Sequence, residues 1–373
     1  MILAMKCRTT IRRTTYVLAS VCLLMRGTAV TAEKTSQPLF VVERNAHCGY
    51  MNRSGQLAIE AAFEDCRDFS EGLAPVQIAE KWGFINESGR IEIQPQFDEC
   101  RWSFAEGLAA VRLGKFWGYV DTKGDFAIPP RFEYAQGFHE GRGIVLVDGG
   151  KHGIIDRSGM LLIPPFDDSG WEFSEGLLPV KSEGKWGFVN FNGDAVIPFR
   201  FHQANEFAQE LASVDFKDDK NQWGFIDRSG KTVIPPKFLD AGDFAEGLAA
   251  VSVDFKYGYV DRSGNLTIPP TFAMAYTFTE GLAVVIDKNH KYGFIDQLGR
   301  FSINPKYNLS FGFVNGLARV SYGKFPGEGL AFDSPELARV PIYEGIWGYV
   351  DKTGKEVWAP PEFKNAENKH EAH

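Results

Sequence analysis

A short segment built around a tryptophan-glycine pair recurs along this chain at a nearly constant interval. Its glycine occurs nine times, and the first seven intervals are 34 to 37 residues long, whereas the last is 55. The nine glycines are Gly49, Gly83, Gly118, Gly153, Gly187, Gly224, Gly258, Gly293 and Gly348. Such a period is typical of repeat architectures, in which each unit buries its apolar surface against the next. Nine units therefore cover residues 39–363.

Each unit reads as three short strands joined by turns. Within residues 107–141, the segments LAAVR, FWGYVD and FAIPP alternate with turn-forming residues. Side chains alternate between the two faces of a strand, so Trp82 and Phe84 share one face, while Gly83 and Ile85 share the other. Neither face is polar, which indicates a strand buried on both sides. We expect an all-β protein of about 35-residue, three-stranded antiparallel meanders.

The repeated tryptophans and glycines are assigned a structural role. Glycine inside a strand weakens it and marks the close approach of another group. We expect a neighbouring group, such as an aromatic ring of the next unit, to pack on this bare backbone. The residues assigned to this framework are Trp82, Trp117, Trp186, Trp223, Trp347, Gly83, Gly118, Gly187, Gly224 and Gly348.

An Asp-x-x-Gly or Asn-x-x-Gly segment follows the Trp-Gly strand, as at Asp121–Gly124. Aspartate and asparagine bond local backbone N–H groups, and glycine adopts positive φ without strain, so a hairpin turn is expected. A row of aspartates can also bind cations, but the turn accounts for both residue types, and we expect no metal and no other cofactor. The proline pairs, such as Pro129–Pro130, lack N–H donors and are expected to end the third strand.

Residues 222–251, QWGFIDRSGKTVIPPKFLDAGDFAEGLAAV, resemble the WG repeat, also called the KWG repeat, which occurs in tandem in many bacterial proteins. The resemblance covers about nine-tenths of the mature chain. It implies a β-rich array and no particular activity. The tryptophan is replaced in four units, by Cys48, His152, Tyr257 and Tyr292. Glu210 replaces the glycine of the EGL segment, so that turn is expected to be strained or rebuilt.

The shape of the array has two possible solutions. A propeller blade usually has four strands and about 40–50 residues, more than this unit provides. The chain also begins and ends with whole units, so no split blade is present to close a ring. We therefore expect an open superhelical stack, with a closed β-propeller-like ring as the alternative.

The first 32 residues have the organisation of a secretory signal peptide. A basic start precedes the apolar run Tyr16–Met25, and the segment AVTA places Val30 and Ala32 before a cleavage point. The apolar run has ten residues, whereas a membrane span needs ~20. We expect export to the periplasm or the medium, with no transmembrane segment in the mature chain.

The charge of the mature chain argues against nucleic acid as a partner. Residues 1–32 contain five Lys and Arg and no acidic residue, so 35 basic and 48 acidic residues remain, a net charge of −13. Nucleic-acid-binding domains usually carry the opposite sign. The same argument disfavours anionic lipid surfaces. Residues 33–38 are interpreted as a linker, and residues 364–373 as a polar tail.

The last unit contains an irregularity. LARV occurs at 317–320 and again at 337–340, and other units place a leucine nine or ten residues before the tryptophan. Leu337 lies ten residues before Trp347, so it is expected to begin a strand, leaving about residues 321–336 as an insertion. This insertion is either a contact site for a partner or a tolerated loop.

Three cysteines belong to the mature chain. Cys66 and Cys100 occupy the same place in adjacent units, and export favours oxidation, so we predict a disulfide between them with Cys48 unpaired. Two small buried residues are the alternative.

The sequence contains no motif for nucleophilic, zinc-dependent or phosphate-binding chemistry, and we assign no catalytic residue. A glutamate precedes the EGL glycine in six units and forms either an acidic ladder or part of solvated turns. The six are Glu71, Glu106, Glu140, Glu175, Glu246 and Glu280.

We expect an exported, non-catalytic scaffold that binds a protein or an envelope component. The alternatives are a carbohydrate- or peptidoglycan-binding module, favoured by an exposed row of aromatics, and an enzyme, favoured by a deep pocket with paired carboxylates.

Overall fold

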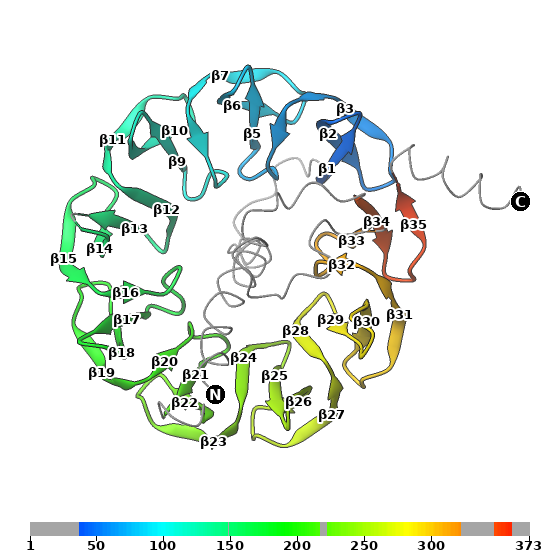
Figure 1. The fold of residues 1–373 in the computed structure, drawn as a ribbon. Coiled ribbons are helices and arrows are strands. Elements are labelled where there is room, and N and C mark those ends of the chain that lie inside the picture. The colour runs from blue at the N-terminus through cyan, green and yellow to red at the C-terminus, as the bar shows by residue number, and fades with distance from the viewer. Residues whose placement is uncertain (1–36, 148, 217–221, 322–346, 360–373) are drawn as a thin grey trace, which may run out of the picture.

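The computed structural model describes residues 37–147, 149–216, 222–321 and 347–359 (Figure 1). These residues form nine antiparallel sheets, which are the blades of a closed nine-bladed β-propeller. The prediction of an all-β chain with nine repeats is confirmed, whereas the predicted open stack is wrong. The predicted signal peptide and polar tail lie outside the described residues.

Blade 1 has three strands, and each of blades 2–9 has four. Within the described residues, blade 1 lacks the strand nearest the centre. In blades 2–9, in order, this innermost strand is β4 (Asp65–Cys66), β8 (Glu99–Cys100), β12 (Tyr134–His139), β16 (Asp168–Ser169), β20 (Gln203–Ala204), β24 (Asp240–Ala245), β28 (Met274–Thr279) or β32 (Leu309–Ser310). The second strand from the centre, in blades 1–9 in order, is β1 (Leu39–Arg44), β5 (Leu73–Ile78), β9 (Leu108–Leu113), β13 (Arg142–Val147), β17 (Leu178–Ser182), β21 (Leu211–Asp215), β25 (Leu248–Val253), β29 (Leu282–Ile286) or β33 (Leu317–Ser321). The Trp-Gly strand is β2 (His47–Asn52), β6 (Lys81–Asn86), β10 (Phe116–Asp121), β14 (Lys151–Ile155), β18 (Lys185–Val189), β22 (Trp223–Asp227), β26 (Lys256–Asp261), β30 (Tyr292–Asp296) or β34 (Trp347–Asp351). The outermost is β3 (Leu57–Phe63), β7 (Ile91–Phe97), β11 (Phe126–Phe132), β15 (Leu161–Phe166), β19 (Ala195–Phe201), β23 (Thr232–Phe238), β27 (Leu266–Phe272), β31 (Phe301–Tyr307) or β35 (Glu356–Trp358).

The innermost strand is the element that the three-stranded unit lacked. It comes from the segment after the proline pair, which leads into the next blade. In β4, β8, β16, β20 and β32 this strand has only two residues. A four-stranded blade therefore fits into the short repeat, so the argument from repeat length against a propeller fails.

The ring closes through side chains of the first and last blades. The hydroxyl of Tyr349 donates to the carbonyl oxygen of Val41 at 2.9 Å, and the Tyr349 ring meets Phe40 edge-on at 5.6 Å. Arg319 pairs with Glu43 at 2.8 Å. A shared buried core holds Phe40, Val42, Met51, Leu317 and Tyr349. A split blade is therefore not needed, because this junction is packed in its own right.

The Trp-Gly strand and the outermost strand pair with an interrupted register. In blade 3, Trp117 lies opposite Phe132, and Tyr119 lies opposite Ile128. One residue of β10, Gly118, thus faces three residues of β11. The outermost strand bulges at its proline pair, which lies within the strand and does not end it. Proline is tolerated there because this edge of the sheet needs no N–H donor.

This bulge explains the repeated glycine. A Cβ atom on Gly118 would lie 2.6 Å from the carbonyl oxygen of Ile128 and 2.7 Å from the nitrogen of Pro130. The close group is thus the backbone of the same blade, not an aromatic ring of the next unit as expected. Comparable backbone approaches occur at Gly49, Gly83, Gly187, Gly224, Gly258 and Gly293.

The tryptophans lie between blades. Trp82, Trp117, Trp223 and Trp347 are 2–4% exposed, whereas Trp186 is only half-buried. Trp117 shares a buried cluster with Ala135 and Phe138 of blade 4.

The last blade differs from our expectation. Its Trp-Gly strand β34 pairs with β33, Leu317–Ser321, and not with a strand that begins at Leu337. Leu337 and nearly all of the predicted insertion lie outside the described residues.

Candidate functional site

The turn after each Trp-Gly strand has the geometry expected from its sequence. In blade 3, one oxygen of the Asp121 carboxylate accepts from the backbone N–H groups of Lys123 at 2.8 Å and Asp125 at 3.0 Å. Gly124 has φ +88°. Its Cα lies against Ile93 of blade 2, because a Cβ there would meet the Ile93 side chain at 2.8 Å. The aspartate and the glycine thus build the turn, which also packs on the preceding blade.

The glutamate of each EGL turn connects consecutive blades. Glu71 accepts from the N–H of Gly107 at 2.8 Å, and Glu280 accepts from the N–H of Gly316 at 2.9 Å. A glutamate makes this bond at six of the seven junctions from blade 2 to blade 9, and Gln209 makes it at the junction of blades 6 and 7. Hydrogen bonds to a charged acceptor are stronger than neutral ones. The row of glutamates is therefore a ladder of interblade bonds.

The replaced tryptophans reveal a second type of interblade bond. Trp82 of blade 2 packs in one buried cluster with Cys100 on the innermost strand of blade 3. At the preceding junction Cys48 stands in place of the tryptophan, and it forms a disulfide with Cys66, whose Cα lies 6.0 Å away. His152, another replacement, bonds Ser169 of the next blade at 2.7 Å.

The predicted Cys66–Cys100 disulfide is wrong. Cys66 and Cys100 occupy matching positions on the innermost strands of consecutive blades, and each faces the Trp-Gly strand of the preceding blade. The partner of Cys66 is consequently Cys48. Cys100 is a free, buried thiol, and burial raises its pKa to about 12. This residue therefore remains a thiol at neutral pH.

Reduction of Cys48–Cys66 is expected to lower the free energy of unfolding by about 2–4 kcal/mol, because it frees an 18-residue loop and unlinks blades 1 and 2. Chemical denaturation with and without reductant measures the effect. Cys66→Ser should reproduce the loss in the absence of reductant, and Cys100→Ala should keep the sensitivity to reductant. Identical oxidised and reduced midpoints would contradict the assignment.

The innermost strands and the residues that follow them vary from blade to blade. On blades 4–6 this region includes His139, Glu172 and Glu206. Burial raises the pKa of Glu206 to about 8; the negative charge of Asp243 adds to the effect, and a bond from the N–H of Trp171 opposes it. Burial also raises the pKa of Glu172, and nearby His139 opposes that shift.

Glu206 should make stability depend on pH. Its pKa in the fold lies above the ordinary value of 4.5, so the folded chain holds a proton that the unfolded chain releases. Stability should thus fall between about pH 5 and pH 8 and level off above that. Denaturation midpoints of Glu206→Gln should show a smaller fall than wild type across this range. Parallel pH profiles for the two proteins would refute the assignment.

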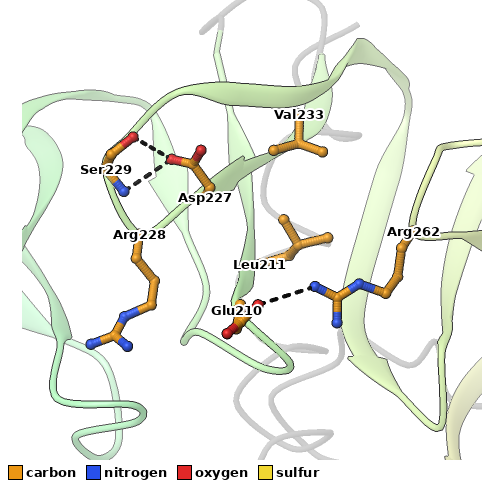
Figure 2. A pocket seen from close by; sticks show the side chains of 7 residues that line it. All are labelled: Glu210, Leu211, Asp227, Arg228, Ser229, Val233 and Arg262. Carbon is orange, nitrogen blue, oxygen red and sulfur yellow. Dashed lines mark hydrogen bonds and ion pairs between the residues drawn. The ribbon is translucent and has the colours of Figure 1, made fainter.

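A cavity of about 410 Å³ opens at the junction of blades 6 and 7 (Figure 2). Its lining residues are Glu210, Leu211, Asp227, Arg228, Ser229, Val233 and Arg262. Glu210 stands where the EGL turn has glycine, and it keeps the left-handed conformation, with φ +65°. The predicted strain is therefore present. Glu210 could be found from the sequence because it departs from the EGL segment of the repeat. Arg228 and Arg262 carry no such signal in the sequence.

Within the described ranges, no three His, Cys, Asp or Glu side chains are grouped so that they could hold a metal ion. No helix in the same ranges has the length and apolar character to cross a bilayer.

A family model described as the WG containing repeat matches nine segments. They are residues 49–82, 82–115, 117–150, 153–186, 186–220, 223–256, 257–289, 292–324 and 347–368. The chain belongs to the WG-repeat family. Each complete WG repeat begins on or beside the Trp-Gly strand of one blade and runs into the next blade. The sequence repeat is thus offset from the structural blade and spans a blade junction.

Comparison with solved structures supports the fold of this WG-repeat protein. No curated protein sequence matches it. The crystal structure of the eukaryotic initiation factor superposes with a TM-score of 0.61 at 13% identity, covering 87% of this chain and 96% of that one. The computationally designed protein Ika8 gives 0.47 at 11% identity, covering 76% and 96%. BamB from Moraxella catarrhalis gives 0.40 at 10%, covering 79% and 96%. Only the first of these structures has a TM-score above 0.5, and at 13% identity its similarity concerns the fold alone.

Proposed function

We propose that this WG-repeat protein is an exported, non-catalytic scaffold whose ring binds another protein or an envelope component. The interblade ladder carries this proposal. The glutamates of the repeat accept backbone N–H groups of the next blade, and the aspartates bond their own turns. The repeated carboxylates therefore stabilise the ring. Residues that differ between blades are the ones left to contact a partner.

The exposed aromatic residues favour protein over glycan as the partner. Among the described residues the exposed large aromatics are all phenylalanines. They are Phe116, Phe126, Phe255 and Phe301. Phe126 and Phe301 also contact rings of the preceding blades, at 6.1 Å from Phe97 and Phe272. The described surface therefore does not present the exposed row of aromatic side chains that would favour carbohydrate binding.

The disulfide between Cys48 and Cys66 supports export, because structural disulfides persist in oxidising compartments and are rare in the cytosol. The signal-peptide pattern of the first 32 residues agrees with this location.

Site-specific photo-crosslinking in intact cells tests the proposal. A photoreactive amino acid at Arg101, exposed beside an innermost strand, is expected to capture one defined polypeptide in the envelope fraction. The same probe at Val196, exposed on an outermost strand, serves as the matched control. Capture of glycan instead of protein, equal capture at both positions, or a cytosolic location would contradict the proposal.

A further inference from the structure

Two blade junctions have a second charged contact on the face that carries the EGL turns. Arg157 of blade 4 donates to the backbone carbonyl of Glu106 in blade 3 at 2.7 Å and lies 3.4 Å from its carboxylate. Lys352 of blade 9 makes the same contacts with Glu280 of blade 8. It donates to the backbone carbonyl of Glu280 at 2.7 Å and lies 3.2 Å from its carboxylate. At these junctions the cation is held by the preceding EGL turn.

The junction of blades 6 and 7 lacks this arrangement. Gln209 takes the place of the glutamate, and its side-chain oxygen is used by the N–H of Gly247 at 3.0 Å. Arg262, the counterpart of Arg157, reaches only the carboxylate of Glu210, at 3.7 Å. That distance is too long for a hydrogen bond. Within the described residues, the Arg262 guanidinium therefore has an ion pair and no hydrogen bond.

The cavity lies beside this guanidinium. Figure 2 shows Leu211 and Val233 between Arg228 and Arg262, with Glu210 below them. Arg228 likewise makes no hydrogen bond to another described residue. The Asp227 carboxylate is occupied by its own turn, since it accepts from the N–H and hydroxyl of Ser229 at 2.9 and 2.6 Å.

Glu210 is retained at a conformational cost. Other EGL turns have glycine at this position, with φ between +75° and +86°. A glutamate at φ +65° is strained.

We propose that this cavity binds a carboxylate carried beside an aliphatic side chain of a partner polypeptide. A guanidinium matches a carboxylate with two parallel hydrogen bonds, and Arg262 offers unused donors beside the cavity. Arg228 also lines the cavity, but its guanidinium is turned toward Gly176 of blade 5. Leu211 and Val233 supply the apolar contact. Glu210 competes internally for Arg262 and so disfavours weak anions. The inference rests on the proposed protein-binding function and names the chemistry of one contact.

The test uses N-acetyl-leucine as the probe and the full mature protein. Methyl NMR signals of Leu211 and Val233 are expected to shift saturably, and N-acetyl-leucinamide, which lacks the carboxylate, should bind at least five-fold more weakly. Arg262→Ala and Arg262→Gln should each weaken binding of the acid at least five-fold. Arg157→Ala is the matched control, because that arginine is already hydrogen-bonded, and it should leave binding unchanged. Glu210→Gly should strengthen binding and raise the melting temperature.

Absence of saturable shifts, equal binding of acid and amide, or unchanged binding in both Arg262 variants would overturn the inference. The probe needs no partner, so this result is separable from the proposed function. If Arg262→Ala leaves binding of a captured partner unchanged, the cavity is not the contact site of that partner, and the scaffold proposal still holds. Probe binding without any captured partner would refute only the scaffold proposal.

Discussion

Replacing Gly224 with alanine is expected to cost about 3 kcal/mol or more of stability, although it adds a single methyl group. The new Cβ would lie 2.6 Å from the carbonyl oxygen of Ile234 and 2.9 Å from the nitrogen of Pro236. Both atoms belong to the backbone of the outermost strand, so no side-chain rotation relieves the clash. The bulge of β23 would have to move away from β22.

Gly242→Ala provides the control for this substitution. Gly242 lies in β24 of the next blade, and the nearest atom to its added Cβ would be 3.8 Å away. Its cost should stay within about 0.5 kcal/mol. Denaturant titration of the two variants measures the difference. Equal midpoints would show that close backbone approach is not the reason for the Trp-Gly motif.

Trp223→Ala should cost about 3–5 kcal/mol and loosen two blades. Trp223 is 2% exposed and belongs to a buried cluster that joins Phe225 and Phe238 of blade 6 to Phe244 and Val251 of blade 7. Removing the indole therefore leaves a cavity on a junction. Hydrogen exchange should accelerate in the strands of both blades.

Trp186→Ala is the matched comparison. Trp186 is only half-buried, so the same substitution should cost distinctly less. Faster exchange confined to blade 6 in Trp223→Ala, or equal losses in the two variants, would contradict the shared interblade core.

Local features of the repeat could be predicted from sequence because their causes are local. The turn at Asp121–Gly124 needs only a carboxylate that bonds nearby N–H groups and a residue that tolerates positive φ. Burial of both Tyr119 and Val120 likewise follows from a strand that is apolar on both faces. These interactions span a few residues and are repeated nine times.

The remaining features depend on how blades meet. A two-residue strand such as Asp65–Cys66 has no periodicity to detect, so the four-stranded blade was missed. The closing bond from Tyr349 to Val41 joins residues 308 positions apart. Pairing of Cys66 with Cys48 requires knowing which strand of one blade faces the innermost strand of the next.

The cavity illustrates the same division. Glu210 was recognisable as a departure from the repeat. The position of Arg262 beside the cavity was not, because it depends on how blades 6 and 7 meet. Departures from a repeat therefore indicate where to look, whereas the ring determines which side chains come together.

The closed ring is tested most directly by one electron paramagnetic resonance distance between spin labels at Gln56 and Lys355, in a Cys100→Ala background. Both positions follow the turn glycines Gly55 and Gly354 and are exposed, one in blade 1 and the other in blade 9. Adjacent sheets pack about 10 Å apart, and Gly55 lies against the backbone of Val357, so the closed ring predicts a short distance of roughly 10–20 Å. A Gln56–Arg90 control pair on blades 1 and 2 should give the same result. An open stack of nine sheets would separate Gln56 and Lys355 by a distance on the order of 80 Å, and that result would contradict the propeller.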